Sequence, residues 1–283
     1  MTLRLLSYLA PSLPYALFEG LARHFGAVTG RQVELGFDTT RSGPRPGEHE
    51  PFDAARVDLA FVCATSYVWL TGVQPAPIEL VGAAWVPTDP RARGRAVYFG
   101  DVLTTVGGPR SLPELTGLRI AYNDEVSLSG HHSLRGALLT AGVDPGTVEL
   151  RHSGSHLRSL ELLDAGEVDA AAIDSNVWRR RGREDVDLAQ RLVTIATLGP
   201  HPVQPLVARA GLPRRLRRQV RAAMLTAHDH PEVAGALRSA ELTRFVPVDD
   251  GAFAPLRTQM AAWSGHRTGS DDTPLFAAGQ VDG

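Results

Sequence analysis

The chain has 283 residues, which is enough for one large domain or two lobes of ordinary size and for a substantial buried core. Its 29 Lys and Arg residues nearly balance its 31 Asp and Glu residues, so the bulk charge predicts neither a nucleic-acid partner nor insertion into a membrane. The single cysteine, Cys63, excludes an internal disulfide, and its apolar neighbours indicate buried packing.

The first part of the chain alternates between strand and helix patterns. Strands are predicted over residues 3–9, 33–37, 57–62 and 79–86, with an amphipathic helix over residues 14–28 and a short helix from residue 66. Residues 38–52 form a long polar loop rich in Pro and Gly, which we expect at the mouth of a cleft.

The amino terminus lacks the features of an export signal. It has no apolar stretch of seven or more residues, no small-residue cleavage site and no lipobox cysteine. The chain as written is therefore predicted to be cytoplasmic, and a location in the periplasm or at the cell surface is expected only if the numbering is that of a processed form.

The central stretch, residues 118–175, predicts successive βα units. Strands are expected over residues 118–122, 148–151 and 168–173, and helices over residues 129–141 and 157–165. An extended segment at 96–106, broken by Gly100, and the segment at 199–202 are interpreted as two crossings between lobes. Residues 1–100 with 201–263 would form lobe 1, residues 101–200 lobe 2, and residues 264–283 a disordered tail.

Elements after the second crossing are assigned to lobe 1. They are a strand at 206–209 and helices over 213–230, 231–242 and 253–263. The Arg-rich start of the first of these helices, residues 214–221, is interpreted as a solvated face, with a contact surface for a partner as the alternative.

Both central helices begin with small hydroxyl residues and glycine. The first amides of a helix have no intrahelical acceptor, and the helix dipole adds partial positive charge, so two such ends at one sheet edge favour an anion site. The alternative is that these serines only cap their own helices. The residues concerned are Ser127, Ser129, Ser153 and Ser155.

Four histidines lie in the same stretch, and Asp174 ends its last strand. His156 is the best candidate for a hydrogen bond to an oxyanion, because it follows Gly154-Ser155 at a helix start. A metal site between His131 and His152 is not predicted, because the spacing does not suit one helix face. Asp174 either points into the cleft or caps the helix that begins at Ser175, and both interpretations stay open.

Three strings, VDLAFVCATSYVWL, AYNDEVSLSG and HSGSHLRSLELLDAGEVDAAAID, resemble the phosphonate/phosphate substrate-binding proteins of ABC transporters. The resemblance extends over about residues 3–250 and implies a type II periplasmic-binding fold. It implies that the serine-rich loop grips phosphonyl oxygens and that tyrosines close over the ligand from the other lobe. The implied ligand-binding residues are Ser127, Leu128, Ser129, Gly130, His131, Ser155, His156, Asp174, Tyr67 and Tyr98. The family usually has Thr where this chain has Leu128, so one hydroxyl donor is missing.

The sequence thus predicts an α/β, two-lobed fold of the type II periplasmic-binding-protein kind, hinged at two crossing segments. It would bind a small oxyanion (phosphonate, phosphate or a related ester) in the interlobe cleft, as the solute-binding protein of an ABC-type uptake system with a permease as partner. No cofactor or metal is predicted. An enzyme of the same fold acting on a small biosynthetic precursor is less favoured, because no assembled nucleophile or phosphate loop is recognisable. An intracellular ligand sensor is the other alternative.

Overall fold

A computed structural model describes residues 2–49 and 51–264 and divides the chain into two compact units. Unit 1 comprises the chain up to Val97 together with Pro202–Ala254, and unit 2 comprises Tyr98–His201 together with the chain from Pro255. Within the described residues the chain therefore passes from one unit to the other three times, after Val97, His201 and Ala254. The sequence predicted two crossings.

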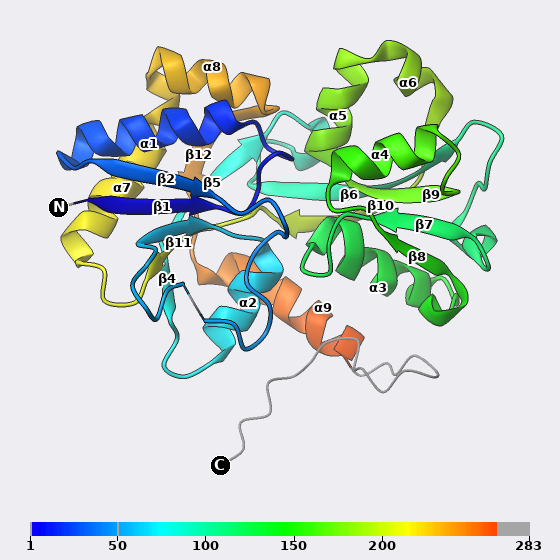
Figure 1. Cartoon of the computed structure of the whole chain (residues 1–283), viewed down its shortest axis with the longest axis horizontal. Coiled ribbons are helices and arrows are strands. Elements are labelled where there is room, and N and C mark those ends of the chain that lie inside the picture. The colour runs from blue at the N-terminus through cyan, green and yellow to red at the C-terminus, as the bar shows by residue number, and fades with distance from the viewer. Residues whose placement is uncertain (1, 50, 265–283) are drawn as a thin grey trace. The chain divides into compact units, whose positions relative to one another are not determined.

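Unit 1 contains a five-stranded mixed sheet in the order β2-β1-β3-β11-β4 (Figure 1). β1 runs parallel to β2 and β3, whereas β11 is antiparallel to β3 and β4. A second, two-stranded sheet pairs β5 with β12. The strands are β1 (Leu3–Ser7), β2 (Val33–Phe37), β3 (Leu59–Phe61), β4 (Ile78–Leu80), β5 (Ala83–Pro87), β11 (Leu206–Arg209) and β12 (Leu242–Pro247).

In unit 1, helices α1, α7 and α8 each bury an apolar face, whereas α2 is buried or half-buried over most of its length. Helix α1 packs against α7 and α8, and it ends at Gly30, whose left-handed conformation (φ 65°) suits glycine. The core includes the ring of Phe18 on α1, which lies 5.3 Å from that of Phe61 on β3. The helices are α1 (Tyr15–Thr29), α2 (Ala64–Gly72), α7 (Arg214–Thr226) and α8 (Pro231–Ser239), with short 3₁₀ turns at Pro90–Ala92, Ala227–Asp229 and Asp250–Phe253.

Two sequence predictions for unit 1 differ from the structure. The single strand predicted over residues 79–86 is two strands in different sheets, because the chain turns at Gly82 (φ 87°). The helix predicted to reach residue 242 ends at Ser239, and β12 follows it. β12 forms through its pairing with β5, which brings Phe245 opposite Trp85.

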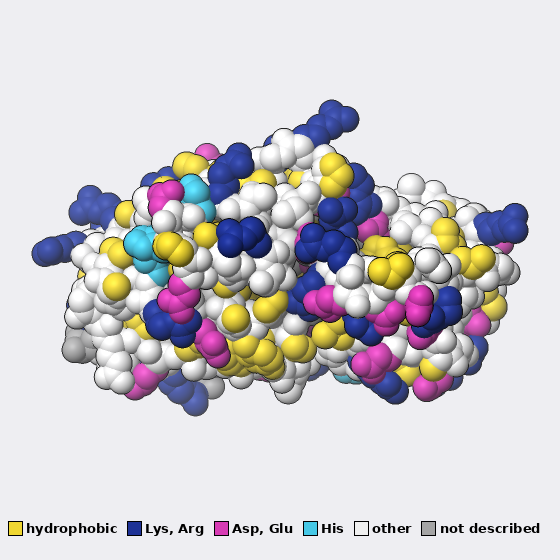
Figure 2. Space-filling model, turned by 90° about the horizontal axis from the view of Figure 1, so that it is seen from above, with side chains coloured by type: hydrophobic (Ala, Val, Ile, Leu, Met, Phe, Trp, Pro, Cys, Tyr) yellow, Lys and Arg dark blue, Asp and Glu magenta, His cyan; other side chains and the backbone are white. Residues whose placement is uncertain are grey.

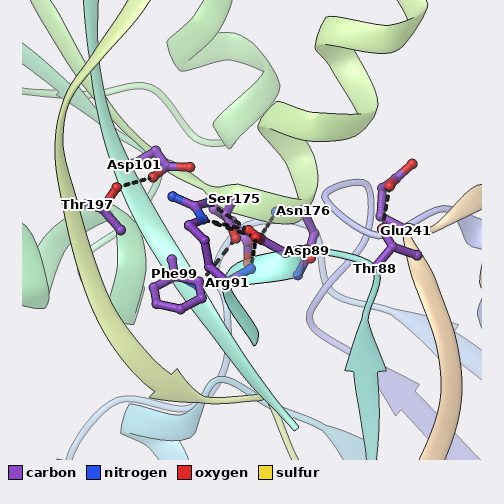
Figure 3. Close-up of polar contacts among 10 residues, drawn as sticks. Thr88, Asp89, Arg91, Phe99, Asp101, Ser175, Asn176, Thr197 and Glu241 are labelled. Atoms are coloured by element: carbon purple, nitrogen blue, oxygen red, sulfur yellow. Dashed lines mark hydrogen bonds and ion pairs between the residues drawn. The ribbon is translucent and has the colours of Figure 1, made fainter. Parts of the chain in front are cut away.

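Unit 2 contains a five-stranded sheet in the order β10-β6-β9-β7-β8. β7 is parallel to β8 and β9, and β6 is antiparallel to β9. On the outer strand β10, Thr197 donates a hydrogen bond of 3.0 Å to the buried carboxylate of Asp101 on β6 (Figure 3). The strands are β6 (Val97–Thr105), β7 (Arg119–Tyr122), β8 (Glu149–His152), β9 (Ala170–Asp174) and β10 (Leu192–Pro202).

Helices cover both faces of this sheet, with α3 on one side and α4 on the other (Figure 1). Along β9, Ala170 and Ala172 pack in the cluster that contains Leu134 and Leu138 of α3. Ala171 and Ile173 alternate with them and pack in the cluster that contains Leu160 and Leu163 of α4. A strand buried on both faces is continuously apolar, as β9 is from Ala170 to Ile173. The helical elements are the π-helix η3 (Leu128–His132), α3 (Ser133–Thr140), α4 (His156–Asp164), α5 (Ser175–Glu184), α6 (Val186–Arg191) and α9 (Ala254–Ser264), with 3₁₀ turns at Leu112–Leu115 and Pro145–Thr147.

The last helix, α9, differs from its prediction. The sequence assigned it to lobe 1, whereas the structure groups the chain from Pro255 with unit 2. Trp263 lies so close to Gly136 of α3 that a β-carbon at Gly136 would collide with the indole ring. The predicted disordered tail lies outside the described residues, apart from Ser264 at the end of α9.

The Arg-rich helix α7 is only partly a solvated face. Arg217 forms an ion pair with Glu79, and Arg221 Nε donates a hydrogen bond of 3.0 Å to the carbonyl oxygen of Gly82. Arg214, Arg215 and Arg218 are exposed. Acidic and basic side chains are interspersed over the face of the protein shown in Figure 2, so that face carries no large field of one sign.

Candidate functional site

Three neighbouring strands of unit 2 end at the same edge of the sheet, and each is followed by polar residues. The parallel strands β7, β8 and β9 lead into Asn123, Ser153 and the pair Asp174-Ser175 respectively. Their carboxyl ends meet at one edge, which is where open α/β sheets bind ligands. The elements that begin here are η3, α4 and α5.

Ser127 closes the turn that opens η3. Its hydroxyl oxygen accepts a hydrogen bond of 3.1 Å from the backbone N–H of Gly130. Its carbonyl oxygen accepts from the N–H groups of both His131 (3.2 Å) and His132 (3.1 Å). The sequence predicted a regular α-helix from residue 129, whereas the structure has a widened π turn before α3 begins at Ser133. Such single π turns occur often at functional sites.

Two glycines allow η3 to approach its neighbours closely. A β-carbon at Gly130 would collide with Asn123 Oδ1 and lie 3.0 Å from Cε1 of His156. A β-carbon at Gly100, on β6, would lie 3.0 Å from the carbonyl oxygen of Ser129. The close approach brings Ser129 Oγ to 3.5 Å from His156 Nε2, at the long end of the hydrogen-bond range.

Ser153 and Ser155 mainly build the start of α4. Ser155 is the N-cap, and its Oγ accepts a hydrogen bond of 3.1 Å from the N–H of Arg158. Ser153 Oγ lies 3.0 Å from the carbonyl oxygen of Tyr122 and 2.6 Å from Ser159 Oγ. The capping interpretation therefore describes Ser155, whereas the Ser153 hydroxyl contacts a backbone carbonyl and the hydroxyl of Ser159.

His156, the first residue of α4, is neutral at pH 7. Its side chain is buried, and burial lowers its pKa to about 4, against a smaller opposing effect of the Ala172 carbonyl. Within residues 2–49 and 51–264, Nδ1 of this ring has no hydrogen-bond partner. A buried imidazole nitrogen left without a partner is costly, so a ligand that supplied one would be bound favourably.

His131 and His152 both pack on Tyr122. The ring of His131 stacks on that of Tyr122 at 4.8 Å, and its Nδ1 lies 3.1 Å from the carbonyl oxygen of Glu125. The ring of His152 lies 5.6 Å from that of Tyr122. In the described part of the chain, no group of three or more His, Cys, Asp or Glu side chains is arranged to hold a metal ion.

Asp174 makes the capping contact. Its Oδ1 accepts a hydrogen bond of 2.8 Å from the N–H of Asn176, which fixes the start of α5. The neighbouring Ser175 Oγ accepts a hydrogen bond of 3.3 Å from the N–H of Phe99 (Figure 3). Asp174 pairs with Gly100 in the β6–β9 ladder, so the start of α5 lies near the turn that contains Ser129.

The other three residues predicted to bind the ligand are Leu128, Tyr67 and Tyr98, and the structure shows the surroundings of each. Leu128 is fully buried and supplies no hydroxyl. Tyr67 belongs to unit 1, is 2% exposed, and donates a hydrogen bond of 2.7 Å to Asp250 Oδ1. Tyr98 is fully buried in unit 2, whereas the sequence placed it in lobe 1, and its ring lies 5.7 Å from that of His201. A ligand contact for either tyrosine stays a prediction.

Sequence reasoning missed two residues that shape this site. Asn123 is buried, and its Nδ2 donates a hydrogen bond of 2.7 Å to Asp124 Oδ2. Its position directly after the strand at 118–122 was the available signal. Gly100 was noted only as a break in an extended segment, although it is the residue that lets β6 lie against Ser129.

A family profile matches almost the whole chain. Residues 5–253 match the family described as the periplasmic substrate-binding protein of phosphonate ABC transporters. The chain belongs to this family.

Solved structures share the fold of this phosphonate-binding family member at low sequence identity. A binding-protein component of a phosphonate ABC transporter from Pseudomonas aeruginosa is 19% identical, with a TM-score of 0.75 over 92% of this chain and 85% of that one. PhnD1 from Prochlorococcus marinus, solved with methylphosphonate, is 15% identical, with a TM-score of 0.77 over 92% and 97%. A Xanthomonas citri protein bound to ATP is 18% identical, with a TM-score of 0.70 over 92% and 96%.

The fold is therefore that of the type II periplasmic-binding proteins, as the sequence predicted. The family consists of substrate-binding components of ABC transporters. Its periplasmic setting does not support the cytoplasmic location expected from the sequence. None of the helices in the described part of the chain is both long enough and apolar enough to cross a bilayer.

Proposed function

We propose that the protein binds a small oxyanion, either a phosphonate, phosphate or a related ester, at the sheet edge formed by η3 and the start of α4. The observation that carries the proposal is the buried group of Ser127, Ser129 and His156 around the Gly130 turn. The methylphosphonate bound by the Prochlorococcus relative supports the ligand class. We also propose that the ligand lies in the cleft between the two lobes, as the family resemblance implies.

The hydrogen-bond donors at this edge can bind an anion even without a positively charged side chain or a metal ion. The first amides of α4 have no intrahelical acceptor, and the helix dipole places partial positive charge there. The hydroxyls of Ser127 and Ser129 can add hydrogen bonds, each contributing about 1.5–3 kcal/mol when the acceptor is charged. Anions are bound in this way at the starts of helices in many proteins.

Binding of methylphosphonate is the direct test. We expect methylphosphonate and phosphate to raise the melting temperature and to give saturable calorimetric titrations, because a ligand that binds only the native state stabilises it. Replacing Ser129 with Ala should weaken methylphosphonate binding by about ten- to a hundredfold, through the loss of one charge-assisted hydrogen bond.

Ser239→Ala is the matched control for that variant. Ser239 lies on the exposed side of α8 in unit 1, where its hydroxyl bonds only to the carbonyl of Gly235 among the described residues, so its loss should leave affinity unchanged. If neither methylphosphonate nor phosphate stabilises the protein at millimolar concentration, the proposed function is wrong.

The proposed role is that of a solute receptor which delivers its ligand to a membrane permease. Family membership supports this partner, because the family is defined by the substrate-binding components of ABC transporters. We expect this protein to form a complex with the permease of an ABC transporter in the presence of methylphosphonate, as co-purification would show.

A further inference from the structure

His156 is an ionisable side chain that the site keeps uncharged. It is 4% exposed, it starts α4, and its Nε2 faces the hydroxyl of Ser129 at 3.5 Å. Burial lowers its pKa to about 4. The other ring nitrogen, Nδ1, is buried and has no hydrogen-bond partner in residues 2–49 and 51–264. Because the ring is neutral, one of its two nitrogens carries no proton and can take one up.

Among the titratable groups on the neighbouring elements, α3 supplies one positive charge, the Arg135 guanidinium, which helps to lower the pKa values of His131 and His132. From η3 come His131 and His132, whose pKa values are also lowered, chiefly by burial. From the loop after β7 comes the buried Asp124, and from the end of β9 comes Asp174, which caps α5. On α4 itself, the Arg158 guanidinium pairs with Glu161 at the surface.

We propose that His156 is the proton acceptor of the anion site, so that binding of the anion is coupled to the uptake of one proton from solvent onto its imidazole ring. The bound state then holds an imidazolium beside the anion, and no covalent bond changes. This inference rests on the proposed function, since it concerns the same ligand at the same residues.

The size of the effect follows from Coulomb's law. A unit negative charge about 4 Å from the ring, at an effective dielectric constant of about 20, favours the protonated imidazole about a thousandfold, or about three pKa units. That shift would raise the pKa of His156 from about 4 in the free protein to about 7 in the complex. The complex then binds more protons than the free protein, so affinity should rise about tenfold per pH unit as the pH falls from about 7 toward about 4.

Calorimetry with methylphosphonate at pH 5.5 isolates the proton on the protein. At this pH the free ligand already carries a single negative charge, so a proton taken up on binding must come to the protein. The net number of protons is obtained from the dependence of the heat on buffer, using two cationic buffers of different ionisation enthalpy that do not compete for an anion site. We expect close to one proton taken up by the wild-type protein.

His156→Gln is the diagnostic variant, because glutamine keeps neutral hydrogen-bonding groups but cannot be protonated. We expect its complex to form with close to zero proton uptake and with an affinity nearly independent of pH. His152→Gln is the control, since His152 is an exposed histidine at the end of β8, and it should retain the wild-type proton uptake. Proton uptake that persists in His156→Gln overturns the inference.

A direct titration decides the case where His156→Gln does not fold or bind. The ring resonances of His156 in the wild-type protein, followed by NMR with and without methylphosphonate, should give a pKa that rises by about three units on binding. Binding without any rise overturns this inference and leaves the proposed function standing. No binding at any pH overturns the proposed function and this inference with it.

Discussion

Gly130 shows how one missing side chain shapes the site. The π turn at Leu128–His132 brings its backbone against both Asn123 and His156. A β-carbon there would collide with Asn123 Oδ1, which cannot retreat easily because the Nδ2 of the same amide is bonded to Asp124. Glycine is needed here for space, since it is not among the residues with a positive φ.

Replacing Gly130 with Ala should therefore widen the turn and move Ser129 away from His156. We expect a loss of stability of about 1–3 kcal/mol, the usual cost of overpacking, together with weaker methylphosphonate binding. Urea denaturation and calorimetric titration measure the two effects. Gly72→Ala is the control, because a β-carbon at Gly72, at the end of α2, meets nothing within 4 Å. A Gly130→Ala protein with wild-type affinity would show that this turn does not contact the ligand.

At this scale the sequence identified part of the candidate site. Ser127, Ser129 and His156 could be picked out because they follow predicted strands and open predicted helices, which is a local signal. Gly100 could not, because its role depends on β6 and η3 meeting across about thirty residues of chain. Asn123 was missed although it directly follows a predicted strand. The π turn was also missed, since a helical hydrophobic pattern does not distinguish a widened first turn from a regular one.

At the scale of elements, the start of α5 shows which role the Asp174 carboxylate plays in the structure. Asp174 ends β9 and caps α5 in one residue, so a strand and a helix share it. The sequence left two roles open for this carboxylate, either a ligand contact or a cap, and the structure shows the capping bond to the N–H of Asn176. The two roles make different demands, because a cap needs only an oxygen acceptor whereas a contact with a ligand amine needs the charge.

Substituting Asp174 with Ala and with Asn tests the capping role. The Ala variant should lose about 1 kcal/mol of stability with the cap, whereas Asn should keep most of it, since Asn caps helices about as well as Asp. Thermal and urea unfolding of both variants provide the measurement. An Asn variant as unstable as the Ala variant would mean that the negative charge of Asp174, rather than its capping oxygen, stabilises the protein.

The βα units of unit 2 were predictable because they are short-range patterns, and β7, β8, β9 and α4 all begin within two residues of the predicted positions. Elements that form only by pairing with distant parts of the chain were not predictable from the sequence. β12 carries no strong strand signal and forms by pairing with β5, about 160 residues earlier in the chain. The break between β4 and β5 requires the turn at Gly82, which the sequence alone does not distinguish from a glycine within a strand.

For the whole molecule, buried histidines determine the response to acid. His132, His156 and His201 of unit 2 are each less than 5% exposed, and burial lowers all three pKa values, to about 4 for His156 and His201. The unfolded chain, whose histidines ionise near 6.5, therefore takes up protons before the folded protein does. Their contribution to stability is complete above pH 6.5 and is lost as the pH falls from about 6.5 toward about 4.

We expect the free energy of unfolding to fall as the pH drops from about 6.5 to 5, by about 1.4 kcal/mol per pH unit for each of these histidines, and the melting temperature to fall with it. Circular dichroism melts at half-unit pH steps would measure it. The His201→Gln variant should show a shallower slope, and His152→Gln, at an exposed site, should match the wild type. A melting temperature that stays flat over this range would contradict the buried, neutral state of these rings.

The assignment of α9 to unit 2 also bears on how the protein could be dissected. Each unit is assembled from separated pieces of the chain, so no single continuous fragment contains a complete unit. A fragment of residues 98–201 would lack Trp263 and leave uncovered the patch of α3 around Gly136 on which the indole rests. An autonomous version of unit 2 would have to be encoded with residues 255–264 rejoined to it through an engineered linker, much as a circular permutant reconnects distant ends.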